Sequence, residues 1–274
     1  MDILYGINTQ TGWRSDMEDE HAIYLDDRRE FFAAEIYDGH GGREAANIAA
    51  RMLTPYFMHA WTKDLEKPLK ERHRLYDLLH RAYLAVDSHI IESGINGGTT
   101  AANLFIIGDR FMAANAGDTR VVINTAEGCL SLTKDHKPEF PEERRRIESL
   151  GGEVISYGVA RVQGVLSMSR ALGDAYLKPY VTTEPRIIEG FLGMENHFAI
   201  LACDGVWDVL TQEDVMEMTL SIANAEKAAA AIATKALDYG SVDNITVIVL
   251  DLRSYVKALK REKMEITKVV DYAL

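Results

Sequence analysis

The hydrophobic pattern of the chain changes its period after the pair Gly41-Gly42, and this change limits the folds open to it. Before the pair, residues 3–37 hold three short apolar and aromatic runs separated by turn residues, which is typical of strands. After it, apolar residues recur at helical spacing over 45–56, and a second stripe of the same kind covers 75–90. The chain therefore predicts strands followed by two amphipathic helices that need a sheet to cover.

Strand-like and helix-like segments alternate over the rest of the chain. We expect strands at 99–107, 110–115, 119–124, 187–191, 197–203 and 245–252, and helices at 141–151, 212–222 and 225–239. This order indicates an α+β domain in which two sheets pack together with helix pairs outside. The domain is predicted to span 1–252. The mixed Lys/Glu and apolar pattern of 253–274 predicts a helical C-terminal extension.

Charge and hydropathy exclude two classes of function. The 274 residues include 30 basic and 42 acidic ones, a net charge of −12, so binding to nucleic acid through a broad basic surface is not expected. The longest apolar runs are too short to cross a bilayer, and no signal-like segment opens the chain. The two cysteines do not have metal-ligand spacing. We predict a cytoplasmic protein, with the nucleus as the alternative, that is monomeric and has no membrane partner.

Carboxylates interrupt the apolar runs at three places where strands begin or end. Asp38-Gly39 follows the strand that ends at 37, Asp204-Gly205 follows 197–203, and Asp243 directly precedes the last strand. Carboxylates gathered in one place repel each other unless a cation compensates. Oxygen ligands without clustered histidine or cysteine favour Mg²⁺ or Mn²⁺ over zinc. Arg14 stands four residues before Glu18-Asp19, and a guanidinium beside such a site suits a phosphate.

Eight short motifs in a fixed order carry a resemblance to a known family. They are RSDMED at 14–19, DGHGG at 38–42, GGTTA at 97–101, NAGDTR at 115–120, TKDHKP at 133–138, SRALGD at 169–174, DGVWD at 204–208 and DN at 243–244. Over roughly residues 3–252 the chain resembles the type 2C metal-dependent serine/threonine protein phosphatases, the PPM family, in its eukaryotic-type branch. The resemblance implies a four-layer αββα fold, two antiparallel sheets in a β-sandwich flanked by pairs of helices.

The resemblance also implies a role for each matching residue. Asp38 would bridge two Mn²⁺ or Mg²⁺ ions, Asp204 and Asp243 would complete the ligands of one, and Glu18 with the Gly39 carbonyl would serve the other. Asp19 would hold water behind the ligands, and Asp135 and Asp208 match a weaker third ion position. Arg14 would bind the substrate phosphate, and His40 would protonate the departing serine or threonine oxygen. Phosphoprotein substrates would be hydrolysed by a water that two ions activate, without a covalent phosphoenzyme.

Simpler interpretations stay open beside these roles. The carboxylates could cap turns, Arg14 could be an ion-pair partner of Glu18, His40 a turn histidine and Asp208 a helix residue. We interpret Asp118 and Asp174 as structural, and Glu35 as a residue that interrupts its strand, an irregularity that a β-bulge could absorb. Two other functions compete. An inactive scaffold should lack ligands, yet all are present, and a two-metal nuclease is disfavoured by the acidic composition.

Overall fold

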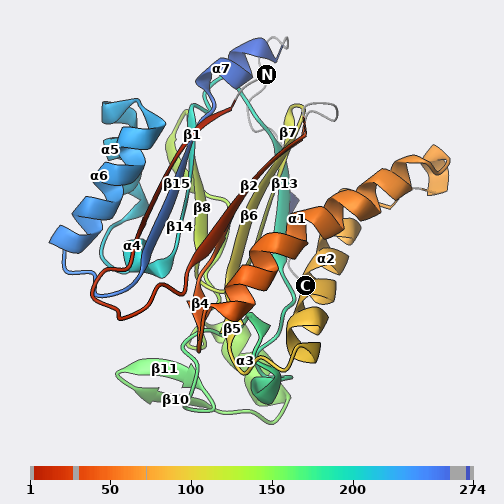
Figure 1. Ribbon diagram of the computed structural model, residues 1–274, viewed down its shortest axis with the longest axis vertical. Coiled ribbons are helices and arrows are strands. Elements are labelled where there is room, and N and C mark those ends of the chain that lie inside the picture. Colours follow the sequence, from red (N-terminus) through yellow and green to blue (C-terminus); the bar gives the residue numbers. More distant parts are fainter. Residues whose placement is uncertain (1–2, 27–30, 72, 260–269, 272–274) are drawn as a thin grey trace.

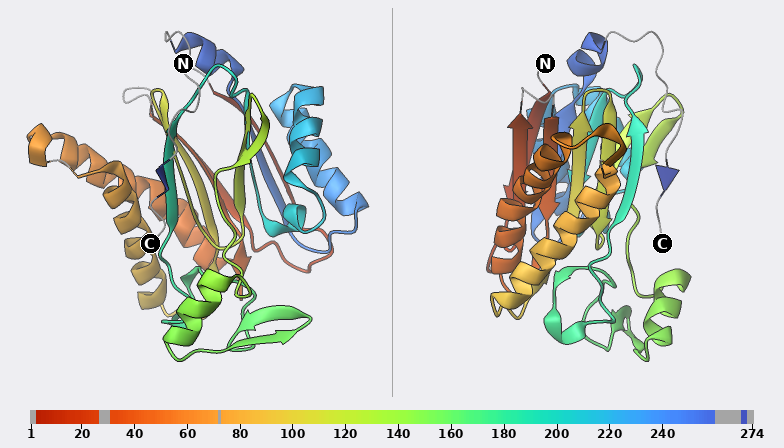
Figure 2. Two further views of the ribbon diagram at one scale, coloured as in Figure 1. Left: turned by 180° about the vertical axis from the view of Figure 1, so that it is seen from behind. Right: turned by 90° about the vertical axis from the view of Figure 1, so that its right-hand side faces the viewer.

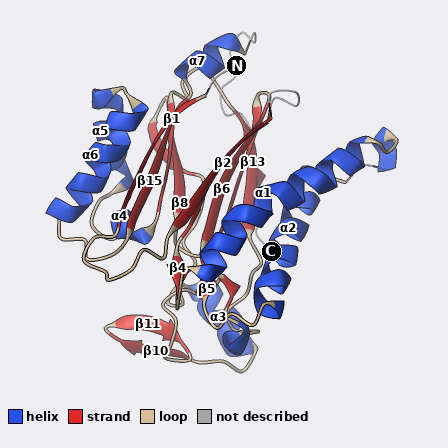
Figure 3. Ribbon diagram, in the orientation of Figure 1, coloured by secondary structure: helices blue, strands red, loops and turns tan. Residues whose placement is uncertain are grey.

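Two β-sheets pack face to face, and helices cover both outer sides (Figure 1). The architecture is taken from a computed structural model that describes residues 3–26, 31–71, 73–259 and 270–271. Strands and helices segregate cleanly into separate layers (Figure 3). Among the described residues, no helix combines the length and the apolar character that a bilayer crossing requires.

The first sheet has five strands in the order β1-β15-β14-β8-β9. They are β1 (Leu4–Gln10), β15 (Ile245–Asp251), β14 (Phe198–Ala202), β8 (Arg120–Thr125) and β9 (Gly128–Ser131). All neighbouring pairs are antiparallel. The earliest strand, β1, pairs along its whole length with β15, so that Leu4 lies opposite Asp251.

The second sheet has six strands in the order β16-β13-β7-β6-β3-β2. They are β16 (Val270–Asp271), β13 (Arg186–Phe191), β7 (Arg110–Ala116), β6 (Ala101–Ile107), β3 (Phe31–Tyr37) and β2 (Glu20–Asp26). The pairing is again antiparallel throughout.

Three apolar layers hold the sandwich together, and each follows from strand alternation. Side chains such as Ile36, Leu104 and Leu201 fill the space between the sheets. The opposite face of the second sheet packs on α1 (Glu44–Leu65) and α2 (Leu75–Glu92), which lie side by side in Figure 2. The outer face of the first sheet packs on α5 (Gln212–Ile222) and α6 (Ala225–Asp238). The predicted α+β sandwich with flanking helix pairs is confirmed.

The remaining elements gather mostly at one end of the sandwich. There lie α3 (Pro141–Ser149), the hairpin β10 (Val154–Tyr157)–β11 (Val159–Val162), the short helix α4 (Asp204–Trp207) and a small sheet of β12 (Leu172–Gly173), β5 (Gly98–Thr99) and β4 (Gly39–His40) (Figure 1). Two 3₁₀ turns cover Leu69–Glu71 and Ala175–Leu177, and α7 (Arg253–Ala258) lies at the opposite end. The sequence pattern did not reveal β9, the β10–β11 hairpin or β16.

Several element boundaries differ from the sequence prediction. Helix α1 continues through Pro55 to Leu65, because its buried face extends to Trp61. The strand expected at 99–107 is broken at Thr100, so that Gly98–Thr99 belong to the small sheet and β6 begins at Ala101. In the extension, the predicted helix covers only Arg253–Ala258, and Val270–Asp271 pair as a strand with β13. The rest of 253–274 beyond Leu259 lies outside the described residues.

The bulge expected at Glu35 is wrong, because β3 pairs without interruption on both sides. Glu35 instead faces the helix layer and is fully buried. Its Oε1 accepts hydrogen bonds from Thr54 Oγ1 at 2.5 Å and Asn103 Nδ2 at 3.0 Å. Burial raises the pKa of Glu35 to about 8, although these bonds act in the opposite direction.

Candidate metal centre

The carboxylates singled out in the sequence converge at one end of the sandwich. Asp38 leaves β3, and Glu18-Asp19 lead into β2, so these come from the second sheet. Asp204 follows β14, and Asp243 precedes β15, so these come from the first sheet. Antiparallel order places these strand ends together. The charges of Asp19, Asp204 and Asp243 all act on Asp38.

Asp38 is held by its backbone at the centre of this group. Its N–H donates to Thr100 Oγ1 at 3.1 Å, and its carbonyl accepts from the N–H of Thr100 at 2.8 Å. The break in the β5–β6 segment therefore serves to fix Asp38. Burial, followed by the charges of Asp19 and Asp204, raises the pKa of Asp38 well above its ordinary value. Repulsion from the neighbouring carboxylates destabilises the ionised form of Asp38, and a bound cation would offset this repulsion.

Asp19 lies beside Asp38 and is 3% exposed. One ligand atom each from Asp19, Asp38 and Cys203 lie within 4.8 Å of one another. Asp19 Oδ2 accepts from Thr246 Oγ1 at 2.7 Å, while Oδ1 has no partner among the described residues. Burial raises the pKa of Asp19 to about 6. Burial also raises the pKa of the Cys203 thiol well above its usual value, so the cysteine stays neutral and suits packing better than ion binding.

Asn244 ties together the segments that carry the ligands, and the sequence analysis gave it no role. Its Nδ2 donates to the carbonyls of Thr11 at 2.9 Å and Asp16 at 3.0 Å, and its Oδ1 accepts from the N–H of Glu18 at 2.8 Å. The backbone at Asn244 also passes so close to Gly205 that a Cβ added to Gly205 would lie 2.0 Å from the Asn244 carbonyl oxygen. Glycine after Asp204 is thus required by the approach of the β15 segment.

The Gly39 and Glu18 positions meet in the same way. A Cβ on Gly39 would lie 2.4 Å from the carbonyl oxygen of Glu18, so only glycine fits. Glu18 Oε1 accepts from the N–H of Gly42 at 2.9 Å, just before α1 begins. The two residues predicted to serve one ion are therefore neighbours in space, although 21 positions separate them in the sequence.

Arg14 pairs with Asp243 and not with Glu18. Its Nη2 lies 2.7 Å from Asp243 Oδ2, and 55% of the Arg14 side chain is exposed. The guanidinium therefore stands at the rim of the carboxylate group, on a side chain that is more than half exposed. A planar fork in this position can bind a phosphoryl group beside the cluster.

His40 is paired with a buried carboxylate that the sequence analysis took as structural. Its Nε2 lies 2.7 Å from Asp174 Oδ2, and Asp174 is fully buried. The small sheet builds this pair, because β4 carries His40, β12 ends next to Asp174, and β5 joins the two. Asp174 adopts a left-handed backbone, with φ 50°, and packs over Gly98. The signal for this role was the residue type, a lone Asp after a glycine in the SRALGD motif.

The two residues matched to a third ion have different surroundings. Asp135 accepts two hydrogen bonds from Arg120, at 2.6 and 2.7 Å, and is therefore already neutralised. Asp208 is exposed at the end of α4. Between them, buried Asp118 forms an ion pair with Lys137 Nζ. A cation at this position has to compete with Arg120 for the Asp135 carboxylate.

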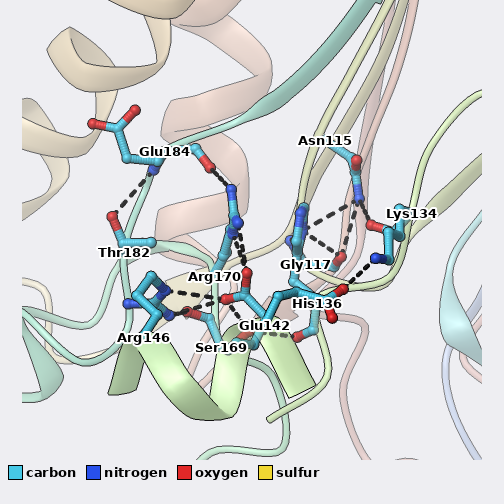
Figure 4. Close-up of polar contacts among 11 residues, drawn as sticks. Asn115, Gly117, Lys134, His136, Glu142, Arg146, Ser169, Arg170, Thr182 and Glu184 are labelled. Carbon is cyan, nitrogen blue, oxygen red and sulfur yellow. Dashed lines mark hydrogen bonds and ion pairs between the residues drawn. The ribbon is translucent and has the colours of Figure 1, made fainter. Parts of the chain in front are cut away.

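A buried ion network fastens α3 to the end of the sandwich (Figure 4). Glu143 on α3 accepts from Arg170 Nη2 at 2.5 Å and from Ser169 Oγ at 2.7 Å. Although burial favours the neutral acid, these contacts bring the pKa of Glu143 down to about 2. On the sandwich side, His136 Nδ1 accepts from the N–H of Gly117 at 3.2 Å. The network fixes the SRALGD segment, and with it Asp174.

The donor set fits hard divalent cations. All the side chains brought together are carboxylates apart from the neutral Cys203, and one buried oxygen of Asp19 lacks a partner. Burial and the charges of neighbouring carboxylates raise the pKa values of Asp19 and Asp38, and a bound divalent cation would favour their ionised forms.

Comparison with known proteins gives one consistent family. The sequence model described as protein phosphatase 2C matches residues 3–245. The chain is 36% identical over 253 residues to probable protein phosphatase 2C 45 of Oryza sativa subsp. japonica, covering 90% of this chain and 86% of that protein. It is 35% identical to probable protein phosphatase 2C 59 of Arabidopsis thaliana, covering 90% of this chain and 78% of that one.

Solved structures show the same fold. A structure titled as a C. elegans sex determining protein superimposes with a TM-score of 0.84 at 27% identity, covering 96% of this chain and 68% of that chain. A serine-threonine phosphatase 2C from Toxoplasma gondii gives a TM-score of 0.79 at 22% identity, covering 91% and 94%.

Proposed function

The chain belongs to the protein phosphatase 2C family and is a protein serine/threonine phosphatase, and we propose that it hydrolyses phosphoserine and phosphothreonine esters with two Mn²⁺ or Mg²⁺ ions. The observation that carries this proposal is the carboxylate group at the sandwich end, where burial and neighbouring carboxylates raise the pKa values of Asp38 and Asp19. When bound, the ions would lower the pKa of a water and so make it a nucleophile at neutral pH.

Different side chains of the carboxylate group would bind different ions. Asp38, on which the charges of Asp19, Asp204 and Asp243 all act, would contact both ions. Asp204 and Asp243 would serve one, and Glu18 with the Gly39 carbonyl would serve the other. Asp19, whose free Oδ1 points into a buried space, would orient water. A third ion would bind more weakly, because Asp135 is held by Arg120.

Arg14 and His40 would act on the substrate. Arg14 would exchange part of its contact with Asp243 for the phosphoryl oxygens and so hold the phosphorus in line with the water. His40 would protonate the leaving serine or threonine oxygen. Nε2 contacts Asp174 and Nδ1 is buried without a partner among the described residues, so the contact with Asp174 fixes the orientation of the partly exposed imidazole. Asp174 would therefore be a positioning residue that sets the plane of the imidazole.

The substrates would be phosphoproteins, and we propose that the enzyme acts as a monomer in the cytoplasm or the nucleus. The decisive test is turnover of a phosphoserine peptide by metal-stripped protein, with and without added Mn²⁺, beside a single-stranded DNA substrate. Turnover of the peptide that requires metal supports the proposal. Cleavage of the DNA, or full peptide turnover without metal, would overturn it, and no turnover of either would favour a binding module.

A leaving-group comparison tests the role of His40. A serine alkoxide needs a proton to leave, whereas para-nitrophenolate does not, so His40→Gln should lower kcat on a phosphoserine peptide about 10²–10⁴-fold and much less on para-nitrophenyl phosphate. His80→Gln is the matched control. His80 lies on α2, outside the carboxylate group, and also pairs with a carboxylate, that of Glu184 at 2.5 Å. Equal losses on both substrates at saturating metal would show that His40 only supports the structure.

A further inference from the structure

Trp13 is a large, solvent-exposed side chain next in sequence to Arg14 of the candidate site. It is 81% exposed, although an indole normally buries most of its surface in a folded protein. It directly precedes Arg14, the residue proposed to bind the phosphoryl group. A single exposed apolar residue is common on protein surfaces and needs no special explanation. A functional role for Trp13 therefore depends on the structure and position of the loop that carries it.

The loop around Trp13 is held in place on both sides. Asn244 Nδ2 donates to the carbonyls of Thr11 and Asp16, which flank the tryptophan. The N–H of Arg14 donates to the carbonyl of Thr11 at 3.3 Å, closing a turn across Trp13. A Cβ on Gly12 would lie 2.1 Å from the Asp243 carbonyl oxygen, so the backbone is pressed against the β15 segment. The indole is therefore presented from a fixed backbone.

The position of the loop places the indole near a bound peptide. The loop joins β1 to β2 at the end of the sandwich where α4 and the β10–β11 hairpin also lie (Figure 1). Arg14 Nη2 contacts Asp243 Oδ2 within the carboxylate group. Consecutive Cα atoms are about 3.8 Å apart. If Arg14 holds the phosphate, a side chain one or two positions from the phosphorylated residue can reach Trp13.

The surroundings of Trp13 favour a cationic side chain. The chain has a net charge of −12, and Asp16, three residues on, is exposed and is not one of the proposed ion ligands. Its Oδ2 accepts only a local bond, from Ser15 Oγ at 2.7 Å, among the described residues. The face of an indole attracts guanidinium and ammonium groups, and arginine stacks on it.

We propose that Trp13 and Asp16 form a subsite for a lysine or arginine flanking the phosphorylated residue. The inference rests on the proposed function, and it assigns the enzyme a preference for basic phosphopeptides. The arginine stem and guanidinium lie on the indole, and the Asp16 carboxylate pairs with the charge.

The test compares phosphoserine peptides that carry either arginine or uncharged norleucine at positions −2, −1, +1 or +2. We expect kcat/KM to favour arginine at one or more positions by about two- to fivefold, the range of an exposed cation–aromatic contact. This ratio should fall with added salt. It should approach one in Trp13→Leu and persist in Trp13→Phe, and Asp16→Asn should lower it. Tyr56→Leu, an exposed aromatic on α1 exchanged in the same way, is the control.

The outcomes separate this subsite from the activity itself. A peptide ratio near one in the parent enzyme, or a ratio unchanged in Trp13→Leu, overturns the subsite while peptide turnover leaves the phosphatase function standing. A preference for norleucine that Trp13→Leu abolishes also overturns it, since the indole would then bind apolar and not cationic side chains. Absence of turnover with every peptide and either metal overturns the proposed mechanism, and the subsite with it.

Discussion

Replacing Glu35 by glutamine should change how the stability of the protein depends on pH. Glu35 is a carboxyl group on the helix-facing side of β3, three residues before Asp38, with Thr54 and Asn103 as hydrogen-bond donors. Burial raises its pKa from 4.5 to about 8. The folded protein therefore holds a proton on Glu35 between about pH 5 and pH 8, where the unfolded chain has lost it.

The sign and size follow from proton linkage. Because the folded state binds more protons in this window, the free energy of unfolding falls as pH rises, by up to about 1.4 kcal/mol per pH unit for this one group. Over the whole window the loss would reach about 4 kcal/mol, an upper bound because water entering on ionisation reduces it. Glutamine keeps the shape and the accepting oxygen but carries no ionisable proton. The variant should therefore lack this loss.

Urea unfolding of metal-free protein from pH 5 to pH 9 measures the effect. The quantity to follow is the difference in free energy of unfolding between Glu35→Gln and the parent at each pH, because other buried carboxyls contribute to both proteins alike. This difference should move in favour of glutamine by several kcal/mol as pH rises. Glu127→Gln, on the exposed turn between β8 and β9, provides the matched exchange. A difference that stays constant, or moves toward the parent, would refute the reasoning.

Three other predictions concern the site. Chelation should abolish phosphopeptide turnover and lower Tm, and Mn²⁺ at a hundred times its Kd should return about 2.7 kcal/mol per ion, so full activity of stripped protein would contradict the two-ion proposal. Asp38→Asn should abolish turnover yet raise the urea midpoint of metal-free protein, because it removes a charge that Asp19 and Asp204 repel, and a lower midpoint would count against that repulsion. Gly205→Ala should destabilise the fold by about 1–3 kcal/mol and reduce activity, since its Cβ would meet the Asn244 carbonyl at 2.0 Å, and normal stability in thermal unfolding would show that the crossing is looser than described.

The fold was largely predictable because its helices and strands show the two hydrophobic periods typical of buried helix and strand faces. The stripes of α1 and α2 and the apolar runs of β6, β14 and β15 identify buried faces without reference to the rest of the chain. What the pattern could not give were elements set by distant contacts. Residues 154–162 form a hairpin with exposed Tyr157, so no buried alternation marks it. Glu35 was misjudged because a buried acid that accepts from Thr54 on α1 and Asn103 on β6 looks, in sequence, like an interruption of its strand.

The candidate site was also predictable only where the sequence signal is local. Clustered carboxylates at strand ends could be recognised locally, since Asp38 and Asp204 each follow an apolar run and precede a glycine. The residues that hold them in place could not, because their partners lie far away in the chain. Asn244 contacts Thr11 across 233 positions, and Asp174 contacts His40 across 134. No local pattern distinguishes such residues from ordinary turn residues.

The pairing of β1 with β15 has a consequence for the order in which the protein can become active during synthesis. Leu4 finds its partner only when Asp251 has been made, and Glu18 needs Asn244 in the same way. Until then the first strand has no neighbour in its sheet, and the group that would hold the ions lacks Asp243. A chain still emerging from the ribosome would thus bear Arg14, proposed to bind the phosphate, and most of the carboxylates without an assembled centre. On the proposed site, catalysis would begin only when β15 has paired with β1, so a growing chain would not dephosphorylate its surroundings before that strand is in place.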